Sequence, residues 1–534
     1  MIEDARSLSP GETVIADVCV VGAGVAGITL GLDLAGRGLS VVVLEGGGVR
    51  RSASSDALYD CRVEGTVDDY SKSRSRYLGG SSNCWTGWCQ PISRTDMASR
   101  DWVRASGWPV AHEDLIAHAR RAAAILEVDP DLDLANALER APDGADVLPL
   151  SADKFRTTLS LISPPTRLGT IYRDAMRRAD RLRVILHANV VEIVPAPNPA
   201  LIDSVAIRTL QGGTARCRAR HFVLAAGGIE NARLLLASKG HGERGIGNGR
   251  DLVGRYFMDH PRVRAGLLTL KDPSRFSRLY DSSYFRTHVP FGLSLTVADE
   301  LAARERLLPC QIGFRAVFVG EDTLRAIRLR DALGHGAATA KARAAIVADP
   351  LRTAGSVLPN AFAYGLRKAS VRRMIKHFVL ETVVEPEPDP DNRVTLSTAR
   401  DLVGMPKAAV RWSVGDLERR SLARALDLMR DELQSRGLGR VVIETPPEER
   451  EILSTSHHMG TTRMHPDPAR GVVDPDGRVH GIGNLHVTGS SVFPTGLVGP
   501  PTMTIVMLAL RLGARLAETH RADGFLPDDR PAVA

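Results

Sequence analysis

A glycine-rich turn near the start of the chain constrains the fold more than any other feature. Residues 18–21 form an apolar, β-branched run that leads into the turn GAGVAG at 22–27. A helical pattern follows at 28–37, and a second apolar run at 39–44 ends in Glu45. Strand, glycine turn, helix, strand and acid in this order are typical of a dinucleotide-binding βαβ unit. The alternative is a glycine-rich helix start in an unrelated α/β fold.

The parts of this turn have distinct expected tasks. Its glycines allow a tight turn, close approach of the backbone to a pyrophosphate and close packing of the helix on the strand. Glu45 follows Gly22 by about the twenty residues expected of the acid that binds an adenosine ribose hydroxyl. We expect the cofactor to be bound here by Gly22, Gly24, Val25, Ala26, Gly27 and Glu45.

Residues 456–506 form the second informative region. Here His457 precedes a helical pattern at 502–517, which begins directly after Pro501. Proline is tolerated in a first helical turn, and Thr502 and Thr504 are able to cap free amides. The start of a helix favours negative charge. This helix start would therefore suit the pyrimidine edge of a flavin, which becomes anionic when it accepts hydride.

Five further motifs lie between or within these regions in a fixed order. They are YLGGSSN at 77–83, HFVLAAGGIENAR at 221–233, GRYFMDHP at 254–261, NRVTLS at 392–397 and HHMGT at 457–461. With the glycine turn, they resemble the glucose-methanol-choline (GMC) family of FAD-dependent oxidoreductases over most of the chain. In that family the first two motifs contribute to the FAD site, the next two belong to or lead into the substrate domain, and the last carries the catalytic histidine.

The resemblance implies a fold and a domain plan. The fold class is α/β, with a discontinuous Rossmann-like FAD-binding domain and a substrate-binding α+β domain built on an antiparallel sheet. A chain of 534 residues is also too long for one ordinary core. We expect the FAD-binding domain at 1–100, 185–265 and 450–534, and the substrate-binding domain at 101–184 and 266–449.

The cofactor that the resemblance implies is FAD. Relatives often have His at the position of Cys84, and in some, such as pyranose oxidases, this His is bonded to the flavin. A thiolate is able to form a cysteinyl link, whereas the alternative is a buried, inert cysteine beside Trp85. Beyond the glycine turn, the residues expected to bind FAD are Gly79, Gly80, Ser81, Asn83, Cys84, Val191, Ala226, Gly227, Ser490, Pro501, Thr502 and Met503.

The implied reaction is oxidation of an alcohol, with hydride passing to flavin N5 while a base takes the hydroxyl proton. Histidine suits that base, and His457 matches the family's catalytic residue. A second His or Asn normally faces it, but here Pro500 occupies the position and has neither a side-chain donor nor an amide proton. Either His458 or another side chain replaces it, or His457 suffices at a reduced rate, or the protein does not oxidise alcohols. We favour the first, with His457 and His458 as catalytic residues.

The substrate is less defined by the sequence. Residues 378–385 alternate like a strand that lines a pocket, and Glu381 is the best candidate for a pocket carboxylate. An acidic lining would attract a cationic alcohol, whereas the acids at 387–391 fit a solvated hairpin tip. Within the family, the chain resembles bacterial sugar and glycoside oxidases and aminoglycoside alcohol oxidases. This resemblance implies a sugar- or aminoglycoside-like alcohol as the substrate, as in natural-product or antibiotic biosynthesis. The expected electron acceptor is O2 or a dye or redox protein.

Two alternatives belong to other function classes. One is a non-redox flavoprotein of the same fold, such as a lyase or isomerase. The other is a flavin-binding protein without catalysis of its own. Reduction of the flavin by a substrate would separate both from an oxidoreductase.

Composition narrows the partners and the compartment. The net charge is +7, and the basic residues at 325–343 fit a solvated helical face without interleaved aromatics, so we expect no nucleic acid. No long apolar run lacks glycines and charges, so we expect no membrane span. Glu3 and Asp4 argue against a secretory signal, and six cysteines without regular spacing fit the cytoplasm. The spacing of Cys84 and Cys89 predicts no metal site.

Overall fold

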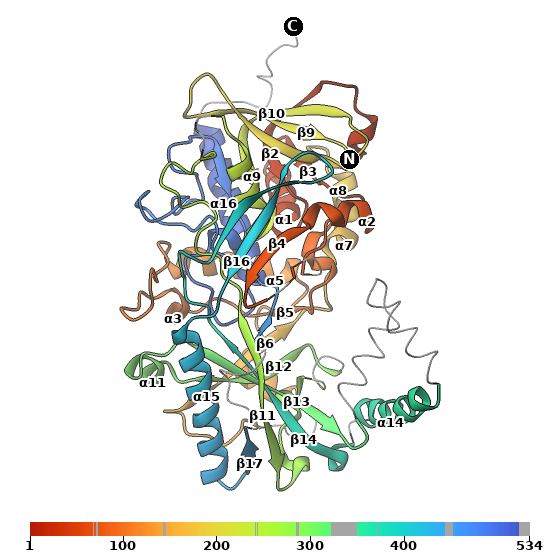
Figure 1. Ribbon diagram of the computed structural model, residues 1–534, viewed down its shortest axis with the longest axis vertical. Helices are drawn as coiled ribbons and strands as arrows, with labels where there is room; N and C mark the ends of the chain where they lie inside the picture. The colour runs from red at the N-terminus through yellow and green to blue at the C-terminus, as the bar shows by residue number, and fades with distance from the viewer. Residues whose placement is uncertain are drawn as a thin grey trace.

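The computed structural model contains two large sheets, one in the upper and one in the lower part of Figure 1. It describes residues 1–67, 69–70, 73–141, 146–240, 242, 244–282, 284, 288–321, 350–369, 371–443 and 452–522, without the side chains of 275 and 350–358. The basic cluster noted at 325–343 lies outside the described residues. Within the described ranges, no helix has both the length and the apolar character needed to cross a membrane.

The upper sheet has eight strands and is mostly parallel. β1, β7, β3, β2, β10 and β19 pair in parallel, while β9 and β8 add an antiparallel edge. The order is β1 (Ile2–Asp4), β7 (Leu182–Leu186), β3 (Val41–Leu44), β2 (Glu12–Val21), β10 (Thr214–Leu224), β9 (Ile202–Arg208) and β8 (Asn189–Pro195), with β19 (Leu485–Val487) on β10.

Helices cover both faces of this sheet because its central strands are apolar on both faces. Val18 and Val20 belong to a core cluster with residues of α1 (Val25–Gly36) and α16 (Thr502–Ala522). Cys19 and Val21 belong to the other cluster, with residues of α9 (Gly227–Ala237). The expected strand–turn–helix–strand unit is therefore present. The helix expected at 28–37 begins three residues earlier, at Val25, and the helix expected at 502–517 extends to Ala522.

The lower sheet is antiparallel. Its order is β17 (Gly439–Val442), β11 (Pro261–Leu270), β14 (Ile375–Val384), β13 (Cys310–Phe318), β12 (Phe291–Val297), β6 (Phe155–Ile162) and β5 (Trp88–Cys89), with β18 (Leu453–Ser454) on β11. The long helix α15 (Asp416–Ser435) contacts β11, β13, β14 and β17. In β14 the buried residues Phe378, Leu380 and Thr382 alternate with Glu381 and Val383, which line a cavity. The two faces of this sheet therefore have different roles.

Three placements differ from the expected domain bounds. β7 straddles the boundary expected at 184/185 and lies wholly in the upper sheet. α4 (His112–Ile116) and α5 (Ala119–Ile125) pack against α16, although 101–184 was expected in the other domain. The strand expected at 392–397 is β15 (Arg393–Arg400), which forms a three-stranded sheet with β16 (Pro406–Trp412) and β4 (Cys61–Gly65) and packs on α9.

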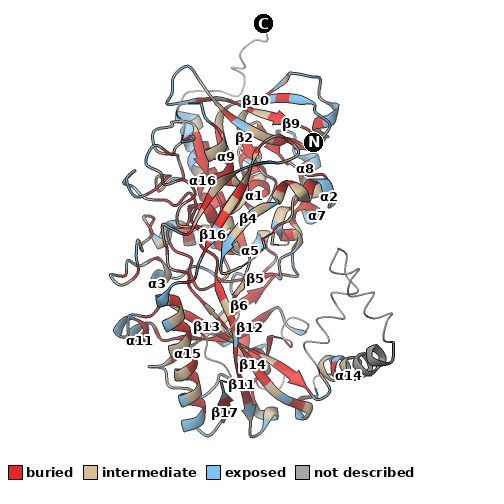
Figure 2. Ribbon diagram, in the orientation of Figure 1, coloured by how far each residue is buried: buried red, intermediate tan, exposed pale blue. Residues whose placement is uncertain are grey.

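Further helices complete the described fold, and buried residues run along the strands of both sheets (Figure 2). Because each sheet is buried, the cavity between them is held by a rigid frame on both sides. These helices are α2 (Ala53–Asp56), α3 (Arg94–Met97), α6 (Leu134–Glu139), α7 (Leu168–Ile171), α8 (Arg173–Arg178), α11 (Asp299–Arg304) and α14 (Pro350–Lys368).

Candidate active site

A cavity of about 610 Å³ is lined by residues of both sheets. On the upper side, Gly22, Glu45 and Ala226 follow the carboxyl ends of β2, β3 and β10 and line the cavity. On the lower side, Glu381 and Val383 of β14 line it. Ligands of open α/β sheets bind outside the carboxyl ends of the parallel strands, so the cavity has the expected position for a cofactor.

The upper end of the cavity is a cradle of glycines. Gly22 has a φ of +104°, and a Cβ there would lie 2.8 Å from the Ala225 carbonyl oxygen. A Cβ on Gly27 would lie 1.8 Å from the Gly22 carbonyl oxygen, and one on Gly80 would lie 2.8 Å from the Gly24 Cα. The two glycine segments therefore approach each other more closely than side chains would permit. Such a cradle fits the pyrophosphate of a dinucleotide.

Glu45 holds the glycine turn in place. Its Oε2 accepts a hydrogen bond from the Ala23 amide at 3.0 Å, and its Oε1 accepts one from the Gly47 amide at 2.8 Å. The carboxylate is buried at the cavity wall. A carboxylate has about four acceptor positions, so Glu45 keeps capacity for a ribose hydroxyl. The structure therefore fits FAD at this end.

Most of the residues expected to bind the cofactor line this cavity. Those on its wall are Gly22, Gly24, Val25, Ala26, Glu45, Gly80, Ser81, Cys84, Ala226, Gly227, Ser490, Pro501 and Thr502. The others expected there, which the cavity lining does not include, are Gly27, Gly79, Asn83, Val191 and Met503.

These five residues have other positions for physical reasons. Gly27 packs against Gly22, and the Gly79 amide donates to the Ala23 carbonyl oxygen at 2.9 Å. The side-chain amide of Asn83 donates to the carbonyl oxygens of Leu78 and Gly80. A bulge in β8 leaves Val191 unpaired, so that Val190 lines the cavity instead. Met503 is buried in the first turn of α16.

Cys84 is exposed and lines the cavity. The interpretation of Cys84 as a buried cysteine is therefore wrong. Its Sγ lies 3.4 Å from the Ser81 carbonyl oxygen, within the short turn that follows Gly80. That turn directs the side chain away from the core, which local sequence does not reveal. Access of the thiol to a bound flavin is consistent with this position.

His457 lies where the two sheets meet. The residue is half-buried and lines the cavity, and its Nδ1 lies 2.8 Å from Nδ1 of His260. Asp259 holds the backbone beside it, because its carboxylate accepts from the His457 amide at 2.9 Å and from the Thr455 hydroxyl at 3.0 Å. A third hydrogen bond to Asp259 comes from the Ser454 hydroxyl at 2.5 Å. The candidate base is thus anchored through both its backbone and its ring.

Burial keeps this histidine neutral. Burial first, and then the neighbouring His260 ring, lower the pKa of His457 to about 3, although the charge of Asp259 opposes the shift. Burial also lowers the pKa of His260, again against Asp259. For Asp259, burial disfavours the charge, but hydrogen bonds from the Ser454 hydroxyl and the His457 amide favour it, and the net shift lowers the pKa. The site therefore pairs two neutral imidazoles with one buried carboxylate.

His458 has a different environment from the one expected. Its Nε2 lies 3.3 Å from the Ser73 hydroxyl, and its ring packs edge-on against Tyr70 and beside Phe257. The side chain that hydrogen-bonds His457 is His260, so the role expected of His458 as the partner of the base is filled by another residue. The GRYFMDHP motif contains His260, but nothing in the local sequence shows that it faces His457.

The loop before α16 also contributes to this arrangement. Pro500 lines the cavity, as its position in the sequence suggests. The carbonyl oxygen of Leu497 lies 3.0 Å from Nε2 of His260. Leu497 has a φ of +58°, a left-handed conformation that is uncommon for residues other than glycine. The loop therefore contacts the histidine pair through its backbone rather than through the side chain at 500.

The lower end of the cavity is formed by one face of the antiparallel sheet. In β13, Gln311 is paired with Val383 and Gly313 with Glu381, and all four line the cavity. Ser282 and Ser294 add hydroxyls. This face offers hydrogen-bonding groups from strands that are distant in the sequence.

The charges at this end are matched rather than acidic. Glu381 accepts a hydrogen bond from Arg264 at 2.9 Å, and Arg315 lies 4.0 Å away. Arg262 also lines the cavity, and its buried Nε has no hydrogen-bond partner among the described residues. Glu385 is buried and binds Arg100 through two hydrogen bonds of 2.7 Å. The expected acidic lining is therefore reduced to Glu381, whose charge is paired.

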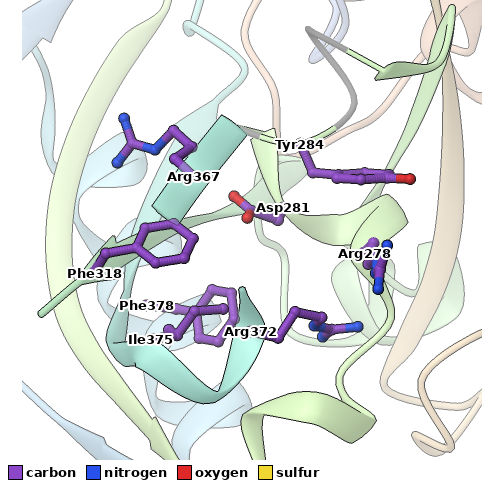
Figure 3. Close-up of a pocket in the computed structure, with 8 residues that line it drawn as sticks. All are labelled: Arg278, Asp281, Tyr284, Phe318, Arg367, Arg372, Ile375 and Phe378. Atoms are coloured by element: carbon purple, nitrogen blue, oxygen red, sulfur yellow. The ribbon is translucent and has the colours of Figure 1, made fainter. Parts of the chain in front are cut away.

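A second, much smaller pocket lies in the lower part of the molecule (Figure 3). Its volume of about 10 Å³ is close to that of a single water, which is too small for a substrate. Asp281 lies between Phe318 and Tyr284 in this view, and its Oδ1 accepts from the Ala316 amide at 3.1 Å. The lining residues are Arg278, Asp281, Tyr284, Phe318, Arg367, Arg372, Ile375 and Phe378.

Comparison with known proteins agrees with the glycine cradle and the fold. The family model of FAD dependent oxidoreductases matches residues 17–289, just over half of the chain. The model of the GMC oxidoreductase C-terminal region matches residues 388–509. The chain belongs to the FAD-dependent oxidoreductases, within the GMC family, and its cofactor is FAD.

Two curated relatives match over part of their length. The large subunit of fructose dehydrogenase from Gluconobacter japonicus is 29% identical over 300 residues, which are 55% of this chain and 47% of the relative. Paromamine 6'-oxidase from Streptomyces fradiae is 28% identical over 325 residues, which are 60% of this chain and 49% of the relative. The chain therefore spans about half the length of the curated relatives it matches.

A solved structure shares the fold over nearly the whole chain. A formate oxidase variant from Aspergillus oryzae superposes with a TM-score of 0.54 and 17% identity, covering 96% of this chain and 100% of the other. At this identity the likeness extends to the fold alone. This match confirms the expected α/β architecture, and the family model over residues 17–289 confirms its FAD-binding domain.

Proposed function

We propose that this protein oxidises an alcohol with FAD, using His457 as the base. The observation that carries the proposal is the position of His457, a neutral imidazole anchored at the wall of the cavity that contains the glycine cradle. When bound, FAD supplies the hydride acceptor, its N5 atom. The comparisons give no support to a lyase or isomerase.

The residues around His457 perform three tasks in this reaction. His457 takes the hydroxyl proton of the alcohol, because its neutral form is the resting form at pH 7. The buried Asp259 carboxylate then stabilises the imidazolium, and hydrogen bonds from the Ser454 and Thr455 hydroxyls stabilise the carboxylate itself. The mostly apolar walls of the cavity give the reacting atoms an environment of lower dielectric than water, which strengthens these interactions. His458 is proposed to support this site through its packing on Tyr70.

We propose a hydroxyl-rich, sugar-like alcohol as the substrate. Support comes from Ser282, Ser294, Gln311 and Glu381 at the lower end of the cavity, which offer hydrogen bonds to several hydroxyls. The partial similarity to fructose dehydrogenase and paromamine 6'-oxidase points in the same direction. Because Arg264 pairs with Glu381, we expect no strong preference for a cationic amino sugar. A role in antibiotic biosynthesis is proposed on the similarity to the paromamine enzyme.

The test is an anaerobic visible spectrum of the purified protein during titration with sugars, amino sugars and simple alcohols. Bleaching of the flavin by one compound, which is at least about hundredfold slower in His457→Asn with equal FAD content, is the expected result. A yellow protein that no compound in a broad alcohol panel bleaches would contradict the proposal. Reoxidation by air or only by an added dye then separates an oxidase from a dehydrogenase.

We further propose a cytoplasmic location, which the six free cysteines support.

A further inference from the structure

The contacts of His260 define which of its nitrogens carries a proton. Its Nε2 lies 3.0 Å from the Leu497 carbonyl oxygen, and a carbonyl oxygen is able only to accept. Nε2 of His260 therefore carries a hydrogen and donates it. A neutral imidazole has one protonated nitrogen, so Nδ1 of neutral His260 is a bare acceptor.

This assignment determines the tautomer of His457. The two Nδ1 atoms are 2.8 Å apart, so one of them must donate to the other. Because Nδ1 of His260 is bare, Nδ1 of His457 carries the hydrogen, and Nε2 of neutral His457 is then bare. Among the described residues, no group hydrogen-bonds Nε2 of His457, and the residue is half-buried and lines the cavity.

We propose that His260 is a positioning residue that holds His457 in the tautomer whose bare Nε2 accepts the proton of the alcohol. The Leu497 carbonyl oxygen sets the orientation of His260, and His260 in turn sets that of the base. This inference rests on the proposed function. The alcohol O–H bond breaks with its proton going to Nε2 of His457, while the C–H electron pair leaves as hydride toward the FAD.

The replacement of the second histidine or asparagine by Pro500 fits this arrangement. The loop at 497–500 supplies a backbone carbonyl where a side chain would otherwise contact the base, and His260 connects the two. The left-handed conformation of Leu497 is consistent with a loop whose backbone is constrained by this contact. His260 is itself fixed, because it is buried and lies between Asp259, which binds the His457 amide, and the first residue of β11.

Protonation of His260 would reverse the assignment. A cationic His260 would donate from Nδ1 to His457, which would leave the only proton of His457 on Nε2, facing the substrate. Burial disfavours this cation, whereas the Asp259 carboxylate favours it, and His457, His458 and Arg262 are the other titratable or charged groups nearby. Activity should therefore fall on the acid side as the pair takes up a proton.

The first test compares His260→Asn with His260→Phe. Asn offers an acceptor to Nδ1 of His457, whereas Phe keeps the ring shape without any hydrogen-bonding atom. We expect Phe to lower kcat roughly tenfold to hundredfold, a part of the about 10²–10⁴-fold contribution of general base catalysis, and Asn to retain more of it. If Phe matched the wild type, or retained more activity than Asn, His260 would have a packing role only. His486→Phe, a buried histidine outside the cavity lining, is the matched control for stability.

The second test does not depend on turnover. FAD-loaded protein with 15N-labelled histidine is measured by NMR at pH 7, and the His457 signals are assigned by their loss in His457→Gln. We expect a protonated Nδ1 and a bare Nε2 in the wild type, and loss of this preference in His260→Phe. A proton on Nε2 in the wild type would overturn the inference even if alcohols are oxidised. The expected tautomer without any alcohol oxidation would instead contradict the proposed function.

Discussion

The two ends of the cavity differ in how the chain builds them. At the upper end, the cradle is formed by the short segments around Gly22 and Gly80, and its close contacts are between backbone atoms. At the lower end, the lining comes from single side chains on β11, β12, β13 and β14, which are separated by long stretches of sequence. In the proposed function, the cofactor would thus be held by local backbone geometry, whereas the substrate would contact side chains that only the tertiary fold brings together.

The largest effect is expected from a side chain in the cradle. In Gly27→Val, the Cβ would meet the Gly22 carbonyl oxygen at 1.8 Å, so the turn must shift. We expect FAD binding to weaken at least about hundredfold, corresponding to an overpacking cost of roughly 3 kcal/mol. FAD content and affinity measured by flavin fluorescence check this. Gly36→Ala is the matched control, because a Cβ there meets nothing within 4 Å. Normal FAD binding by the valine variant would mean that the cradle is not the cofactor site.

The second effect separates chemistry from cofactor binding. His457→Asn removes the candidate base but leaves the glycine cradle untouched. We expect kcat for the best alcohol to fall about 10²–10⁴-fold, as for loss of a general base, with unchanged FAD content. Stopped-flow measurement of flavin reduction gives the rate. A variant that reduces its flavin at the wild-type rate would exclude His457 as the base.

The sequence predicted the upper end of the cavity closely and the lower end poorly. The glycine turn, Glu45 and the start of α16 were identified because their spacing is local. Five residues expected there do not line the cavity: Gly27, Gly79, Asn83, Val191 and Met503. For Val191 the reason is a β-bulge, and for Met503 it is the burial of its side chain in the first helical turn. At the junction, His457 was identified by its motif, but its partner His260 lies 197 residues away in the chain and was not. Likewise, nothing near Glu381 in the sequence indicates Arg264 on the neighbouring strand.

The third prediction concerns the loss of stability at acid pH that two histidines cause, His486 in the upper sheet and His457 between the sheets. Burial first, and then His221, lower the pKa of His486 in β19 to about 3. In the unfolded chain this histidine has a pKa of about 6.5, so below that pH it binds a proton that it does not bind in the folded protein. The stability of the folded protein therefore decreases as the pH falls from about 6.5 toward 3. At pH 5 the loss is about 2 kcal/mol for one such group.

Thermal unfolding between pH 7 and pH 5 measures this loss. The Tm of the wild type should fall over this range. The Tm of His486→Leu should fall less, because this variant lacks the titrating group. The Tm of His457→Asn should also fall less than that of the wild type. Parallel curves for the wild type and both variants would exclude these histidines as the cause.

The smallest effect is expected at the lower end. Glu381→Gln removes one paired charge but keeps the shape and an acceptor, so the KM for a sugar-like alcohol should rise several-fold, or about 1 kcal/mol, with little change in kcat. The ratio of KM values for neutral and amino sugars should change little, because Arg264 already compensates Glu381. Glu387→Gln, at a carboxylate that the cavity lining does not include, is the control. A large rise in KM for amino sugars alone would instead indicate that Glu381 binds the cationic group of the substrate.

The contact of the Leu497 carbonyl with His260 has an evolutionary consequence. Every amino acid carries a backbone carbonyl, so no substitution at 497 deletes this hydrogen-bonding group. Selection at 497 should therefore act on backbone preference, with glycine and asparagine tolerated better than valine or isoleucine at a φ of +58°. Insertions and deletions between 497 and 500 should be far more harmful than point changes. The functional requirement on this loop would therefore be visible in its length more than in the identity of its residues.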